Sequence, residues 1–75
     1  MFEYLITQKL GVLSTLKNGV TLELNKVSFN GEAAKWDLRR WGTNGSGERR
    51  MHKGVTLTYD EIKALKETLN AFQDL

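Results

Sequence analysis

The chain has 75 residues and a net charge of +2. This length predicts one small domain that buries only about 60% of its extended-chain surface. It contains no cysteine and a single histidine, His52, which excludes disulfides, thiolate chemistry and zinc sites built on a pair of histidines. No apolar segment approaches the roughly 20 residues needed to cross a bilayer. We expect a cytoplasmic protein (nucleoid-associated if bacterial) that binds no membrane, metal or cofactor.

The first half of the chain predicts two paired strands. Asn18-Gly19 is a strong turn signal, so a strand over about 3–16 should form a hairpin with one over about 20–29. Gly11 marks a possible bulge, where the register of the first strand changes. The second strand alternates apolar and polar side chains with a period of two, which predicts one buried face. The residues expected on that buried face are Val20, Leu22 and Leu24.

A second turn at Asn30-Gly31 leads into a third strand over about 35–42. Trp36 lies on its apolar face, which predicts a core residue, and Trp41 lies on the opposite face with Arg39. We therefore expect Trp41 to contact a base or a second subunit, and the alternative is ordinary packing under a loop. Trp36 remains the alternative for that role.

A loop rich in glycine precedes a fourth strand over about 50–57. Met51, Val55 and Leu57 share a parity with Lys53, which does not suit a regular strand, so we expect a bulge near 52–54. The loop lacks the Gly-Lys-Ser/Thr ending of a phosphate-binding loop, which favours an ordinary hairpin connection.

The last element is a helix over about 59–73. Thr58 and Glu61 form a capping box at its start. At about 100° per residue its apolar side chains gather in one arc, which predicts packing on one face of the sheet. These side chains are Ile62, Leu65, Leu69 and Phe72. The predicted fold class is α+β, a four-stranded antiparallel sheet followed by one C-terminal helix in a single domain over 1–75.

The candidate site is the segment 35–57, which places two tryptophans among six basic side chains. Cations suit phosphates and flat rings suit exposed bases, so the pattern is typical of single-stranded nucleic-acid binding. Few carboxylates accompany these charges in the sequence, and arginines dominate. The alternative is a solvated charged face. Neither His52 nor the Asp60-Glu61 pair has the partners that catalysis needs, so we expect no enzyme.

Two motifs resemble the C-terminal domain of the transcriptional coactivator positive cofactor four, and its compact bacterial relatives more closely. They are Leu24-Asn-Lys-Val-Ser-Phe29 with Lys35-Trp-Asp-Leu-Arg39, and Lys53-Gly-Val-Thr-Leu57 leading into a helix. The similarity covers residues 20–72. It implies a homodimer with curved sheets, in which each subunit offers a concave channel to single-stranded DNA. We expect no regulatory N-terminal tail like that of the coactivator, and the Gly-rich loop at 42–48 is a further departure, so the coactivator's partners are not carried over.

The resemblance also implies a set of binding residues. Phe29 and Trp41 fall where relatives present aromatic rings to bases, and Arg39, Arg49 and Lys53 fall at or near basic channel positions. Local position adds four more: Lys26, Lys35, Arg50 and His52.

The leading hypothesis is sequence-independent binding of single-stranded DNA by a homodimer, in transcription regulation, replication or repair. An RNA-binding module is the first alternative, because a sheet with aromatic rings accepts RNA as readily. A domain that docks an acidic protein partner is the second. Duplex DNA is a further possible ligand, although a single helix does not suit a helix-turn-helix reader.

Overall fold

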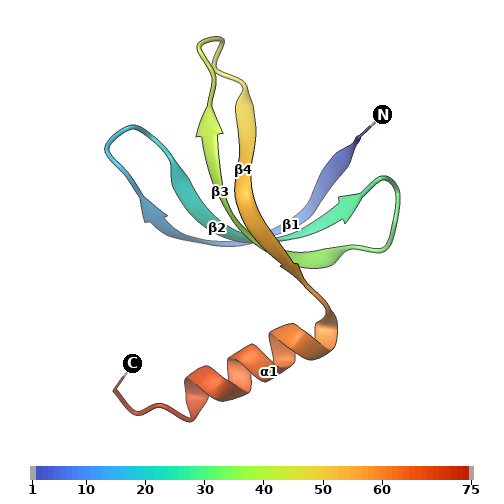
Figure 1. Cartoon of the computed structure of the whole chain (residues 1–75), viewed down its shortest axis with the longest axis vertical. Helices are drawn as coiled ribbons and strands as arrows, with labels where there is room; N and C mark the ends of the chain where they lie inside the picture. The colour runs from blue at the N-terminus through green and yellow to red at the C-terminus, as the bar shows by residue number, and fades with distance from the viewer. Residues whose placement is uncertain (1, 75) are drawn as a thin grey trace.

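The structure is a computed structural model that describes residues 2–74. Four strands form one sheet in the order β1-β2-β3-β4, with all neighbours antiparallel, and one helix follows (Figure 1). This confirms four antiparallel strands and one C-terminal helix. The elements are β1 (Tyr4–Thr15), β2 (Thr21–Phe29), β3 (Lys35–Thr43), β4 (Arg49–Leu57) and α1 (Tyr59–Asn70). Each strand boundary lies within one residue of its expected position, whereas the helix ends three residues before the expected 73.

Two short turns reverse the chain where the sequence indicated them. Gly19 has φ 84° between β1 and β2, and Asn30 and Gly31 have φ 52° and 77° between β2 and β3. Glycine and asparagine adopt this left-handed conformation at low cost, which explains why these residues mark the turns. The third connection is also tight, because the Asn44 side chain accepts hydrogen bonds from the amides of Ser46 and Glu48.

Bulges bend the sheet strongly. β1 carries three register shifts against β2, one of which adjoins Gly11 as expected, and the other two left no sequence signal. Tyr4 pairs with Phe29 at one end of β2 and Trp41 pairs with Thr21 at the other, yet the two rings lie 5.5 Å apart. The sheet therefore coils until its far ends meet, as the bent strands in Figure 1 show.

The coiling reverses the expected burial of β2. Its alternate side chains divide between a concave face, which carries Val27 and Trp41, and an outer face, which carries Leu24 and Trp36. The buried side chains all belong to the concave face: Glu23, Asn25, Val27, Asp37 and Trp41. The prediction that Val20, Leu22 and Leu24 form the buried face is wrong, because these residues are only half-buried.

A bulge in β4 accounts for Lys53. The register against β3 shifts between Arg39 and Trp41, where β4 contains one residue more than β3, which confirms the bulge expected near 52–54. Gly54 lies against Arg39 at this point, and a Cβ added to Gly54 would stand 2.0 Å from the Arg39 Cβ. The Lys-Gly motif thus combines a bulge with a close approach that only glycine permits.

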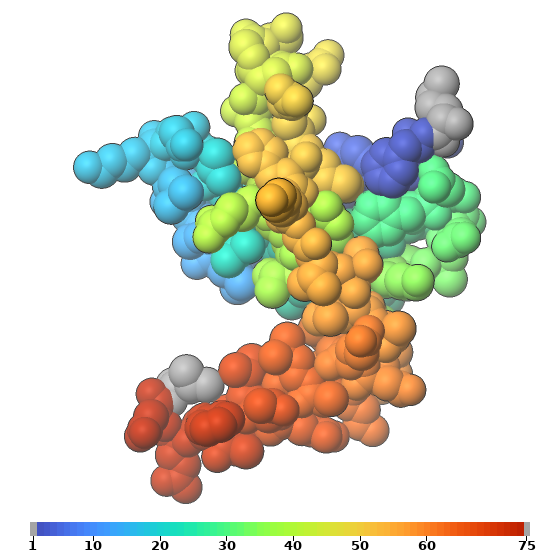
Figure 2. All heavy atoms as spheres, in the orientation of Figure 1, coloured from blue at the N-terminus to red at the C-terminus, as the bar shows by residue number. Residues whose placement is uncertain are grey.

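The helix begins as the sequence predicts but packs less than expected. Both hydrogen bonds of the Thr58–Glu61 capping box form. Tyr59 reaches the outer face, 5.6 Å from the Trp36 ring. No side chain of α1 is buried, and in Figure 2 the red C-terminal half of the helix stands clear of the strands. The predicted packing along the whole helix is wrong: Leu65, Leu69 and Phe72 are 38%, 49% and 60% exposed.

The dimensions of the molecule agree with this open arrangement. Its radius of gyration is 13.8 Å, whereas a compact chain of this length has about 11 Å. Among the residues described, no helix is long and apolar enough to cross a membrane.

Candidate functional site

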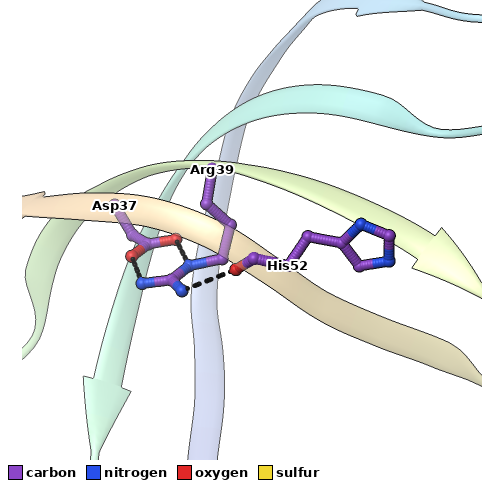
Figure 3. A network of polar contacts seen from close by, with 3 residues as sticks. All are labelled: Asp37, Arg39 and His52. Atoms are coloured by element: carbon purple, nitrogen blue, oxygen red, sulfur yellow. Dashed lines mark hydrogen bonds and ion pairs between the residues drawn. The ribbon is translucent and has the colours of Figure 1, made fainter.

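An ion pair within β3 lies on the concave face, and its arginine also binds the backbone of the β4 bulge (Figure 3). Arg39 donates from Nε and Nη2 to the two carboxylate oxygens of Asp37, at 2.8 and 2.7 Å, and from Nη1 to the His52 carbonyl oxygen at 3.0 Å. The Asp37 side chain is fully buried, and that of Arg39 is 14% exposed. The guanidinium is thus neutralised by Asp37, and it holds the irregular part of β4 in place.

A second ion pair lies on the same face, where Glu23 is the cross-strand neighbour of Arg39. Arg49 donates from Nη2 to Glu23 Oε2 at 2.7 Å, and its Cζ lies 4.9 Å from the centre of the Trp41 ring. Glu23 also accepts hydrogen bonds from the Thr21 hydroxyl at 2.5 Å and the Asn25 amide at 3.3 Å. The carboxylate of Glu23 therefore has a partner on each oxygen.

These contacts determine the ionisation of Glu23. Burial alone raises the pKa of its carboxyl group, but hydrogen bonds from Thr21, Asn25 and Arg49, together with the charge of Arg49, outweigh burial. The net result is a pKa below the ordinary value of 4.5. The folded state thus favours the ionised carboxylate.

This lowered pKa predicts acid sensitivity. A carboxyl group with a lower pKa in the folded state stabilises the fold above its unfolded pKa, and that stability is lost as the pH falls through the folded pKa. Thermal unfolding midpoints of the wild type should therefore fall more steeply below about pH 4.5 than those of Glu23→Gln. Parallel curves for the two proteins would contradict this role of Glu23.

The aromatic side chains do not occupy the expected environments. Trp41, expected to contact a base or a second subunit, is only 1% exposed in this conformation, and its binding role stays a prediction. Its indole Nε1 is buried and has no hydrogen-bond partner within residues 2–74. Trp36, expected in the core, is half-buried on the outer face with the Lys26 ammonium 4.9 Å from its ring centre. Phe29 is half-buried, with the Arg39 guanidinium 5.8 Å from its ring centre.

The structure brings together some of the nine predicted site residues and separates others. Strand register places five on the concave face: Phe29, Lys35, Arg39, Trp41 and Arg49. Lys26 and Arg50 lie on the outer face. His52 and Lys53 lie in the β4 bulge, and both side chains are exposed.

The charges of these residues are also divided. Within residues 2–74, the ion pairs are those of Arg39 with Asp37 and of Arg49 with Glu23. The sequence contains few carboxylates near these basic residues, which predicted that their charges are unpaired. This prediction is wrong for Arg39 and Arg49. In the same part of the chain Lys35, Arg50 and Lys53 are exposed and have no carboxylate partner. No three acidic or histidine side chains of the described chain gather as a metal site would require.

Sequence reasoning missed the polar floor of the concave face, which consists of Glu23, Asn25 and Asp37. A signal was present for Asp37, because Arg39 lies two residues further along the same strand and so shares its face. No comparable signal existed for Glu23. Its partner Arg49 lies 26 residues away and meets it only through the coiling of the sheet.

The sheet is coiled and antiparallel, it carries arginines and aromatic rings on its concave face, and a capped helix follows it. This combination is typical of a protein that binds nucleic acid on a sheet. The profile of the family described as Transcriptional Coactivator p15 (PC4) matches residues 16–68. An uncharacterised protein of Treponema pallidum (strain Nichols) is 47% identical over 70 residues, which cover 93% of this chain and 79% of that relative. The chain belongs to the PC4 coactivator family, whose members bind nucleic acids.

Proposed function

We propose that the protein is a non-catalytic single-stranded DNA-binding homodimer that acts on DNA in transcription, replication or repair. Membership of the PC4 family supports a nucleic-acid ligand. The observation that carries the proposal is the joint presence of arginines and aromatic rings on one concave face. Bases of a single strand are free to reach such a face, whereas those of a duplex are stacked inside it. Such a protein would act in the cytoplasm, at the nucleoid in a bacterium.

The two kinds of basic side chain serve this ligand differently. Lys35 on the concave face and Lys53 in the β4 bulge have no carboxylate partner among the residues described, so each can bind a phosphate without breaking an ion pair. Arg39 shapes the face through Asp37 and presents its guanidinium beside Phe29, where a base can stack. Arg39 therefore organises the surface, and the unpaired lysines attract phosphates to it.

The exposed apolar side of α1 supports the homodimer. Leu65, Leu69 and Phe72 would cost hydration free energy if they remained in water, and residues 2–74 of one subunit include only two buried apolar side chains. A second subunit that covers α1 would supply the missing burial. Sedimentation equilibrium of the full chain measures this directly, and a monomer at high micromolar concentration would contradict it.

The proposal is tested by titrating the protein with fluorescently labelled oligo-dT of about 20 nucleotides, which spans typical single-strand site sizes. Matched duplex DNA and RNA strands are titrated in parallel at several salt concentrations. Tight, salt-sensitive binding that prefers the single DNA strand is expected. Preference for RNA would instead assign an RNA-binding module, and no binding at low salt would exclude a nucleic-acid ligand.

Substitution of Lys35 provides a sharper prediction. Lys35→Ala removes an exposed cation from the concave face, so the slope of log K against log salt should become less steep by about 0.7, the value for one phosphate contact on a single strand. Lys63→Ala on the exposed side of α1 removes the same charge elsewhere and is the control. An equal change in both variants would show that only net charge matters.

A further inference from the structure

On the concave face, the guanidinium of Arg49 lies over the buried ring of Trp41. We call this arrangement the closed state. The Trp41 side chain is almost wholly buried, while the guanidinium of Arg49, 4.9 Å from its ring centre, belongs to a side chain that is 39% exposed. Arg49 thus covers part of this ring, and the Tyr4 ring, 5.5 Å from it between centres, covers another part. The position of Arg49 is fixed by the ion pair with Glu23, which is itself buried.

The closed state leaves one strong donor without a partner. Indole N–H groups in protein interiors normally find an acceptor, and Trp41 Nε1 finds none among the atoms of the described chain. A buried donor without an acceptor destabilises the state that contains it. The closed arrangement therefore carries a penalty that a ligand with acceptor atoms can remove.

We propose that Arg49 is a lid on Trp41, and that Glu23 competes with the phosphates of a bound strand for the Arg49 guanidinium. A phosphate that takes Arg49 from Glu23 uncovers the ring, which then stacks on a base while its N–H donates to an acceptor on the strand. This inference rests on the proposed function and adds a residue, Glu23, that does not itself contact the ligand. Its physical basis is that a guanidinium binds phosphate and carboxylate through the same paired hydrogen bonds.

Removal of Glu23 tests the competition. Glu23→Gln loosens Arg49 and should strengthen oligo-dT binding by up to about fivefold, the upper limit expected for one partly exposed ion pair. Glu67→Gln, on the exposed helix, makes the same change in net charge away from the concave face. Equal affinities of the two variants would overturn the proposal. Circular dichroism of Glu23→Gln first establishes that the variant is folded.

Tryptophan accessibility tests the lid itself without relying on affinity. In a Trp36→Phe background, Trp41 is the sole tryptophan, and acrylamide should quench it poorly in the free protein. Quenching by acrylamide should rise in Arg49→Ala. It should also rise when an abasic strand of phosphodiesters binds, because that probe takes Arg49 but has no bases to cover the ring.

The outcomes separate this proposal from the proposed function. If oligo-dT binds normally while Trp41 stays shielded with the abasic strand and in Arg49→Ala, the lid is wrong and the single-strand function stands. If neither strand binds any variant, both proposals fail.

Discussion

Arg39→Ala is expected to destabilise the fold by about 3–5 kcal/mol, the cost of removing one partner from a buried ion pair. The reason is Asp37, whose fully buried carboxylate would lose two hydrogen bonds and its only cationic partner among the described residues. The link from β3 to the His52 carbonyl would be lost as well. Urea unfolding at fixed protein concentration measures the change, which is large for a 75-residue domain.

Two further variants identify the cause. Arg40→Ala changes the exposed neighbour on the outer face and should alter stability little. Adding Asp37→Asn to Arg39→Ala removes the stranded charge and should restore part of the loss. If Arg39→Ala is no less stable than Arg40→Ala, the ion pair is not structural. If Arg39→Ala unfolds, its DNA binding will fall for that reason alone, and the loss will not show that Arg39 contacts a phosphate.

Trp41→Ala is expected to cost about 3–5 kcal/mol, as other large-to-small substitutions of buried aromatic residues do. Trp41 is the largest fully buried side chain, and it closes the coiled sheet against Tyr4. Loss of DNA binding in this variant would therefore not by itself demonstrate a contact between Trp41 and a base. Thermal unfolding followed by circular dichroism measures the effect.

Trp41→Phe is the matched variant for this position. It retains most of the packing and removes the indole N–H that has no partner, so it should be far more stable than Trp41→Ala. If Trp41→Ala is folded and stable, Trp41 is not required for the fold, and its predicted contact with a base or a second subunit becomes the better explanation of its role.

Local signals in the sequence were sufficient to predict the elements of this fold. Asn18-Gly19 and the Thr58–Glu61 box depend on residues a few positions apart, so short-range chemistry determines them. The bulge at Gly54 could also be inferred, because Lys53 interrupted a period of two. Each of these features is visible within a window of about ten residues.

Burial could not be predicted in the same way. A period of two separates the two faces of a strand but does not say which face the sheet encloses when it coils. The coil arises from three shifts in β1, and it buries Glu23 and Trp41 while it leaves Leu24 half-exposed. The predicted roles of the two tryptophans depended on this choice, which is why the sequence alone did not show that Trp41 is buried and Trp36 half-buried.

The register shifts of β1 also affect how copies of the protein meet. β1 is an edge strand, and an edge strand with a regular row of free N–H and C=O groups recruits further strands from other molecules. Three interruptions in twelve residues, together with one in the opposite edge strand β4, break that row into short pieces. The chain can therefore expose Leu5 and Leu13 along an edge without offering a template for fibrils.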